Sequence, residues 1–228
     1  MKKLESTLPN MVIVLTTVAL VSAGLLGLMQ QLTKDPIALI EKQTLENGIK
    51  SVMLDGQDAQ LSVANEEVIE KNIDGDNYTF TVYSASVDGK PIGRAVKTAV
   101  NGFSPDLTVL VGFDNDGNIK GYEILKHAET PGLGAKADSW FKKGQKGDII
   151  GKNPGTNNLT VSKDGGEVDA ITASTITSRA FLKAVNAEYK AIFDGAKSAS
   201  QDAISGATKV STPSDSTSVA PADSVAVQ

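Results

Sequence analysis

The sequence contains no cysteine and only one histidine, His127, among its 228 residues. Disulfide frameworks, thiolate metal sites, iron–sulfur ligation and cysteine nucleophiles are therefore excluded, as are metal sites built from several histidines. Aromatic residues make up only 5% of the chain, so a core has to be built mainly of Val, Ile, Leu and Ala. Because the side chains offer so little redox or metal chemistry, any such chemistry has to come from a cofactor.

The charge balance excludes a second class of function. The chain has 22 Lys and Arg against 27 Asp and Glu, a formal net charge of −5, and it contains no basic stretch. A nucleic-acid partner is not expected from such a sequence. Charged residues make up 21% and apolar residues 40%, which is an ordinary globular balance, and the length fits one domain with extensions.

A long apolar run lies near the N-terminus. Residues 11–29 carry no charge, and at 1.5 Å per residue a helix over them spans about 28 Å, close to the hydrocarbon thickness of a bilayer. Lys2 and Lys3 precede the run, so the positive-inside rule predicts a cytoplasmic N-terminus. We therefore expect a single-pass protein of a bacterial inner membrane, with the bulk of the chain periplasmic.

A cleaved signal peptide is the alternative interpretation, because Val21-Ser22-Ala23 offers small residues at a suitable spacing. The apolar run continues beyond that position to Met29, which favours an uncleaved anchor. We expect a cytoplasmic stub and transmembrane anchor at 1–34, a periplasmic domain at 35–195 and a tail at 196–228. The tail is rich in Ser, Ala, Asp, Pro and Thr, so we expect it to be disordered.

The exported part alternates between helical and strand patterns. Residues 36–71 have a helical apolar spacing, and residues 176–193 form the best helix after the anchor. The turn sequences Asp88-Gly89 and 114–118 separate runs with strand patterns, which predicts an antiparallel meander. The predicted strands are 78–87, 91–100, 107–113 and 119–125. The expected fold class is α+β, an N-terminal transmembrane helix followed by a domain of antiparallel sheet and helices.

Glu129-Thr-Pro-Gly-Leu-Gly134 is the first segment that suggests chemistry. Glycine has no Cβ, so this loop lets the backbone approach a flat ligand closely. A tight connection between a strand and a helix explains the same residues equally well. The nearby His127 is either a proton donor or a packing residue, and Trp140 is either a stacking residue or part of the core.

The second segment is 169–178, which precedes and opens the helix predicted at 176–193. A helix N-terminus has free N–H groups and a partial positive charge, which suit a phosphate. A plain helix cap is the alternative, although one hydroxyl would be enough for a cap. The segment carries Thr172, Ser174, Thr175, Thr177 and Ser178.

The anchor, the loop at 129–134 and Asp169-x-x-Thr172-x-x-Thr175, in that order, resemble the covalent FMN-binding subunits of bacterial respiratory complexes, RnfG and NqrC. The resemblance covers roughly residues 5–195. It implies that a flavin transferase esterifies the phosphate of FMN to Thr175. This chain has Ala173-Ser174 where the family motif has Gly-Ala. The resemblance also implies that Glu129, Thr130, Gly132, Leu133 and Gly134 lie against the flavin, and that Thr172, Ser174 and Thr177 hold the phosphate.

A second segment in the tail matches the same motif. Asp202-Ala-Ile-Ser-Gly-Ala-Thr208 is closer to the family pattern than 169–175, but no predicted helix follows it. Thr208 is therefore an alternative or additional attachment site, and Thr175 is the preferred one.

The short stretch between the anchor and the first strand favours the RnfG branch of the family over NqrC. The resemblance then implies a flavoprotein translocase subunit that relays electrons between ferredoxin and NAD, with the other membrane and soluble subunits of the Rnf complex as partners. Three alternatives stay open at this point. They are an NqrC-like subunit of a sodium-translocating NADH:quinone reductase, a non-redox anchored periplasmic binding module and a stand-alone extracytosolic flavin reductase.

Overall fold

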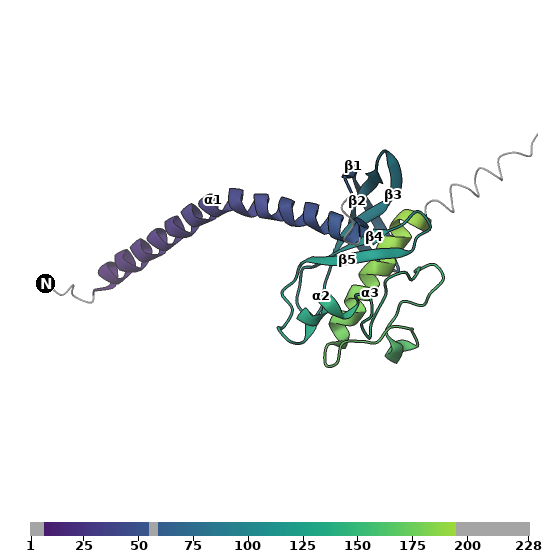
Figure 1. Cartoon of the computed structure of the whole chain (residues 1–228). Coiled ribbons are helices and arrows are strands. Elements are labelled where there is room, and N and C mark those ends of the chain that lie inside the picture. The colour runs from purple at the N-terminus through teal and green to yellow at the C-terminus, as the bar shows by residue number, and fades with distance from the viewer. Residues whose placement is uncertain (1–6, 55–58, 195–228) are drawn as a thin grey trace, which may run out of the picture.

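The computed structural model describes residues 7–54 and 59–194 (Figure 1). The expected disordered tail at 196–228, the N-terminal lysines and Thr208 lie outside these residues. The described chain is one long helix followed by a domain of sheet and helices, which confirms the expected α+β class. The helical elements are α1 (Leu8–Leu54), η1 (Gly134–Lys136), α2 (Ala137–Trp140), η2 (Ser162–Asp164), α3 (Thr175–Tyr189) and the π-helical η3 (Lys190–Asp194).

Five antiparallel strands form one sheet in the order β1-β2-β3-β4-β5, so every strand pairs with its neighbour in the chain. Two-residue turns join the first three strands. Asp74-Gly75 and Asp88-Gly89 all have positive φ angles, between 50° and 92°, as type I′ hairpins require. The strands are β1 (Leu61–Ile73), β2 (Asp76–Val87), β3 (Lys90–Val100), β4 (Leu107–Phe113) and β5 (Ile119–Lys126).

The helix expected over 36–71 is wrong in its second half. Helix α1 ends at Leu54, and β1 occupies Leu61–Ile73 and pairs with β2 along its whole length. The strand contains Glu66, Glu67 and Glu70, which dilute its apolar alternation because it lies at the edge of the sheet. The Asp74-Gly75 dipeptide was the available signal for this hairpin.

The two faces of the sheet are covered by different helices. Helix α3 packs against β3 and β4 over the larger core, which includes Phe80, Phe113 and Phe181. The last turns of α1 pack on the opposite face, with Val52 and Met53 buried. Figure 1 shows α3 running across the sheet from the lower part of the domain, where its N-terminus and α2 lie.

Two glycines paired across β4 and β5 let α1 approach the sheet. Gly112 and Gly121 are in register, and a Cβ on either would lie 2.7–3.0 Å from backbone atoms of Val52. The absence of side chains at these positions therefore fixes the site at which the long helix joins the domain.

Helix α1 is long and apolar enough to cross a membrane once. The side chains of its apolar segment are exposed to the surroundings instead of packing on the domain. The helix contains Pro36 and is bent along its course, as expected where proline removes a backbone hydrogen bond (Figure 1). These features fit the anchor expected at residues 11–29.

Candidate functional site

The two segments singled out in the sequence meet at the N-terminus of α3. They enclose a pocket of about 400 Å³, the size range of cofactor sites. One wall comes from the loop after β5, the second from the start of α3, and the third from the connection between β3 and β4. The lining residues are Phe103, Glu129, Thr130, Leu133, Gly134, Ala173, Ser174, Thr175 and Ile176.

The carboxylate of Glu129 joins all three walls. Its Oε1 accepts hydrogen bonds from the backbone N–H groups of Phe103 (2.9 Å) and Ser104 (3.2 Å). Its Oε2 accepts a 2.8 Å hydrogen bond from the hydroxyl of Thr177 on α3. The residue is only 5% exposed, so these donors satisfy both oxygens of a buried carboxyl group.

Two glycines make room for this carboxylate. A Cβ on Gly102 would collide with Oε1 of Glu129, and a Cβ on Gly134 would collide with Oε2. The Cβ on Gly134 would also lie 2.8 Å from the Thr177 hydroxyl oxygen. Gly134 is therefore required at the close contact between the loop and the helix, which is a reason for glycine that the sequence alone does not reveal.

The loop that carries Glu129 is braced from outside the pocket. Nδ1 of His127 accepts the backbone N–H of Glu129 at 3.2 Å, and Nε2 lies 3.4 Å from a carboxylate oxygen of Asp138 on α2. These contacts fit the imidazole tautomer with its proton on Nε2. Helix α2 is in turn held by Tyr122, whose hydroxyl donates to the carbonyl of Ala137 at 2.7 Å. Burial raises the pKa of the Tyr122 hydroxyl above its usual range, so it stays a donor.

The first turn of α3, which borders the pocket, has backbone N–H groups with no hydrogen-bond partner among the described residues. Ser174 is the N-cap residue, but its side chain makes no capping bond; its hydroxyl instead lies 2.9 Å from that of Thr177. Within the described part of the chain, no acceptor bonds the backbone N–H groups of Thr175, Ile176 and Thr177. Free N–H groups at a helix N-terminus suit an anion, and here they lie next to the half-buried hydroxyl of Thr175.

Ala173 has a backbone conformation that favours glycine. Its φ angle is +63°, in the left-handed region that costs an L-residue about 1–2 kcal/mol. The turn sets the direction in which the chain enters α3. This is the position at which the family motif described above has glycine, so the motif's glycine has a conformational reason.

The structure brings together most of the residues that the sequence nominated. Six of them line the pocket: Glu129, Thr130, Leu133, Gly134, Ser174 and Thr175. Thr177 was expected to hold a phosphate through its hydroxyl, but it is fully buried and that hydroxyl bonds Glu129. Gly132 and Thr172 are exposed and do not line the pocket; Gly132, with φ +76°, forms the turn of the loop.

Three lining residues were missed by sequence reasoning, namely Phe103, Ala173 and Ile176. Ala173 and Ile176 belong to the nominated segment and could have been included. Phe103 lies in a loop between two strands and has no local pattern that separates it from an ordinary surface aromatic. Trp140 is partly buried against the core and donates its indole N–H to the carbonyl of Asp169 at 2.8 Å, which agrees with a packing role.

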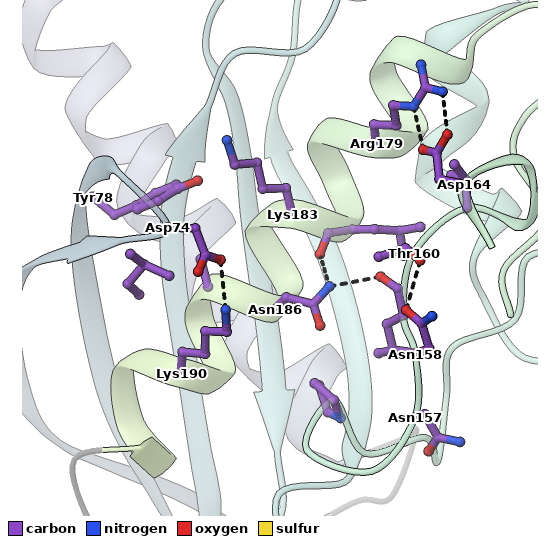
Figure 2. A pocket seen from close by; sticks show the side chains of 16 residues that line it. Asp74, Tyr78, Asn157, Asn158, Thr160, Asp164, Arg179, Lys183, Asn186 and Lys190 are labelled. Atoms are coloured by element: carbon purple, nitrogen blue, oxygen red, sulfur yellow. Dashed lines mark hydrogen bonds and ion pairs between the residues drawn. The ribbon is translucent and has the colours of Figure 1, made fainter. Parts of the chain in front are cut away.

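A second cavity, of about 390 Å³, lies along the side of α3 (Figure 2). Figure 2 shows the ion pair of Arg179 with Asp164 at one end and that of Lys190 with Asp74 at the other. Between them, the Asn186 amide donates to two backbone carbonyls, at 2.8 and 2.9 Å. The charged groups pair with each other and the amide bonds the backbone, so these contacts join α3 to the neighbouring segments. Residues 7–54 and 59–194 contain no cluster of three or more potential metal ligands.

The pocket lies within a region that matches a known family model. Residues 102–190, which include all three of its walls, match the model of the FMN-binding domain. This match favours a flavoprotein over the non-redox binding module considered above.

Comparison with curated proteins identifies similar chains that cover most of this one. The chain is 35% identical to the G component of the ion-translocating oxidoreductase complex of Aliivibrio fischeri strain ES114 over 185 residues, 79% of this chain and 88% of that protein. It is 33% identical to the corresponding proteins of Vibrio parahaemolyticus and Shewanella baltica, in each case over 73% of this chain and 81% of the relative. The chain therefore belongs to the RnfG family of ion-translocating oxidoreductase complexes and carries that family's FMN-binding domain.

Proposed function

We propose that this chain relays electrons within a membrane-bound Rnf-type complex through FMN held as a phosphoester of Thr175. Family membership supports a flavoprotein subunit of an electron-transport complex. We add to this the covalent bond, the acceptor residue and the periplasmic location. We also add electron flow between ferredoxin and NAD, coupled to ion movement. The translocase as a whole needs its other subunits, and the bond to FMN needs a flavin transferase.

The observation that carries the proposal is the meeting of a hydroxyl, free backbone donors and a cofactor-sized pocket at one helix end. Thr175 lies at the first position of α3, and its own N–H and those of the next two residues have no acceptor among residues 7–54 and 59–194. A phosphate on its oxygen would receive those donors and the positive end of the helix dipole. Both oxygens of Glu129 are already bonded by donors of the protein, so the free N–H groups of α3 stay available to the phosphate.

The attachment forms one bond and breaks one. The Thr175 oxygen attacks the phosphorus of an activated flavin nucleotide, the hydroxyl proton is lost to base, and the remainder of that nucleotide leaves. The protein gains one FMN less one water. When bound, the flavin supplies one- and two-electron chemistry that these side chains lack.

The chain's own residues then have distinct tasks. The amides of Thr175 and Ile176 hold the phosphate, and Thr130, Leu133 and Gly134 form the wall opposite. Glu129 fixes the distance between the walls. A phosphoester prevents loss of the cofactor on the periplasmic side, where a pool of free FMN to replace it is not expected.

In-gel flavin fluorescence tests the covalent link. The full chain is produced with and without a flavin transferase, denatured and separated on a gel; the wild type is expected to fluoresce only with the transferase. Thr175→Val removes the hydroxyl with little change in shape and should abolish the signal. Thr79→Val, at an exposed position on β2 outside both the motif and the pocket, is the matched control and should keep it. Equal fluorescence of wild type and Thr175→Val would move the attachment to another residue.

A further inference from the structure

The pocket has an apolar rim that the fold itself does not use. Outside α1, the large hydrophobic side chains exposed by the described residues are those of Val63, Val68, Phe103, Leu133 and Ile176. Three of these five line the same pocket, although they come from three separate segments of the chain. Exposed apolar side chains that converge on one cavity are typical of a ligand-binding surface.

Phe103 is the most exposed of the three. Its side chain is 68% exposed, against 54% for Ile176 and 41% for Leu133, and it belongs to neither buried cluster. Leaving a phenyl group in water forfeits the free energy that burial would provide, so packing of the fold does not explain its position. An aromatic ligand in the pocket would cover it.

The backbone at Phe103 is held firmly. Its N–H donates to Glu129, and Gly102 donates to the carbonyl of Ser104 at 3.1 Å, which closes a tight turn. The same carboxylate also bonds Thr177, two residues after the proposed acceptor threonine. Glu129 therefore positions the aromatic side chain and the phosphate-binding helix end relative to each other.

We propose that Phe103, flanked by Leu133 and Ile176, is the residue that contacts the isoalloxazine ring of FMN attached at Thr175. This inference rests on the proposed function and adds the residue that covers the ring. Aromatic rings prefer offset-stacked or edge-to-face contacts with one another, which gives a phenyl group an advantage over an aliphatic one. Contact with Phe103 shields one part of the flavin from water and limits its movement on the single phosphoester bond.

The test uses the flavinylated full chain in detergent, with FMN content measured by intact mass in every sample. Phe103→Trp places an electron-rich ring where the phenyl group lies, and such a ring in contact with flavin quenches its fluorescence. We expect a severalfold loss of fluorescence relative to wild type at equal FMN content. Val68→Trp places the same ring at an exposed position on β1 and should leave the fluorescence unchanged.

A second variant covers the case in which the tryptophan disturbs the loop. Phe103→Ala removes the ring, and iodide in solution should then quench the flavin more efficiently than in wild type; Val68→Ala should not change this efficiency. The inference would be overturned if both variants had normal FMN content, with unchanged fluorescence in Phe103→Trp and unchanged iodide quenching in Phe103→Ala. That result would leave the proposed function intact and would assign the apolar rim to a protein partner. Absence of FMN from the wild type would overturn both.

Discussion

Thr177 donates its buried hydroxyl to Oε2 of Glu129 at 2.8 Å, joining two residues 48 positions apart in the chain. The bond connects the loop after β5 to the first turn of α3. Both residues belong to the two segments singled out in the sequence. Glu129 lines the pocket, whereas the hydroxyl of Thr177, which was expected to hold the phosphate, bonds Glu129 instead.

Replacing Glu129 should therefore affect both stability and FMN content. Glu129→Ala leaves two backbone N–H groups and one hydroxyl without an acceptor, so we expect a loss of about 3 kcal/mol in the free energy of unfolding and little FMN incorporation. Glu129→Gln keeps one acceptor and the shape, so it should lose less of both. Denaturant unfolding in detergent and intact mass measure the two effects.

Glu123→Gln is the matched control. It removes the carboxylate of a partly exposed pair with Lys142, which should cost less than about 1 kcal/mol. Equal behaviour of Glu129→Ala and Glu123→Gln would show that the Glu129 carboxylate does not hold the pocket together.

Gly134→Ala tests the close contact in the same place. The added methyl group meets the Glu129 carboxylate and the Thr177 hydroxyl, so the loop has to move away from α3. We expect a loss of about 1–3 kcal/mol in unfolding free energy together with reduced FMN content. Gly27→Ala, at a helical position on α1 with nothing within 4 Å of the new methyl group, should lower neither quantity, because alanine is favoured over glycine within a helix.

Ala173→Gly should increase stability, in contrast to Gly134→Ala. It relieves the left-handed strain at φ +63°, so we expect the free energy of unfolding to increase by about 1 kcal/mol, with FMN incorporation maintained or improved. Ala180→Gly, the same substitution within α3, should lower stability by about 1 kcal/mol. A lower free energy of unfolding for Ala173→Gly than for wild type would contradict backbone strain at Ala173.

The buried carboxyl of Glu188 predicts a pH dependence. It is fully buried on α3, and within the described residues neither oxygen has a hydrogen-bond partner that meets normal geometry. Burial raises the pKa of Glu188 well above its usual range, and the nearby backbone N–H of Thr98 offsets this only in part. The folded chain therefore keeps a proton that the unfolded chain releases above about pH 4.3.

The sign of the effect follows from this difference. Stability from Glu188 is fully present below the unfolded pKa and is lost as the pH rises toward the folded pKa, by at most about 1.4 kcal/mol per pH unit. Glu188→Gln removes the titration, so its stability relative to wild type should rise with pH from about pH 5 upward. Parallel stability curves for the two proteins would contradict a protonated buried carboxyl.

The sequence predicted those parts of the fold that local signals determine. The Asp88-Gly89 turn, the strands around it and the helix after residue 175 all agree with the structure, because turn residues and apolar periodicity act over a few positions. Strand β1 was not predicted, because its glutamates obscure the alternation of apolar and polar residues. Its pairing with β2 is also a tertiary contact that the local sequence does not indicate.

The sequence predicted which segments form the candidate site, but it did not predict the contacts between them. Thr175 and the 129–134 loop were identifiable from residue types and order. Burial of the Thr177 hydroxyl depends on a contact across 48 residues, and the inclusion of Phe103 depends on how the β3–β4 connection folds over Glu129. Neither contact can be predicted from the local sequence.

The central claim is that Thr175 carries FMN, and mass analysis tests it most directly. The full chain is purified from cells that express a flavin transferase shown to modify a known acceptor, and its intact mass and peptides are measured. We predict a gain of one FMN less one water on the peptide containing Thr175, absent from Thr175→Val. An unmodified wild-type chain, or FMN found on the peptide containing Thr208 alone, would contradict the account.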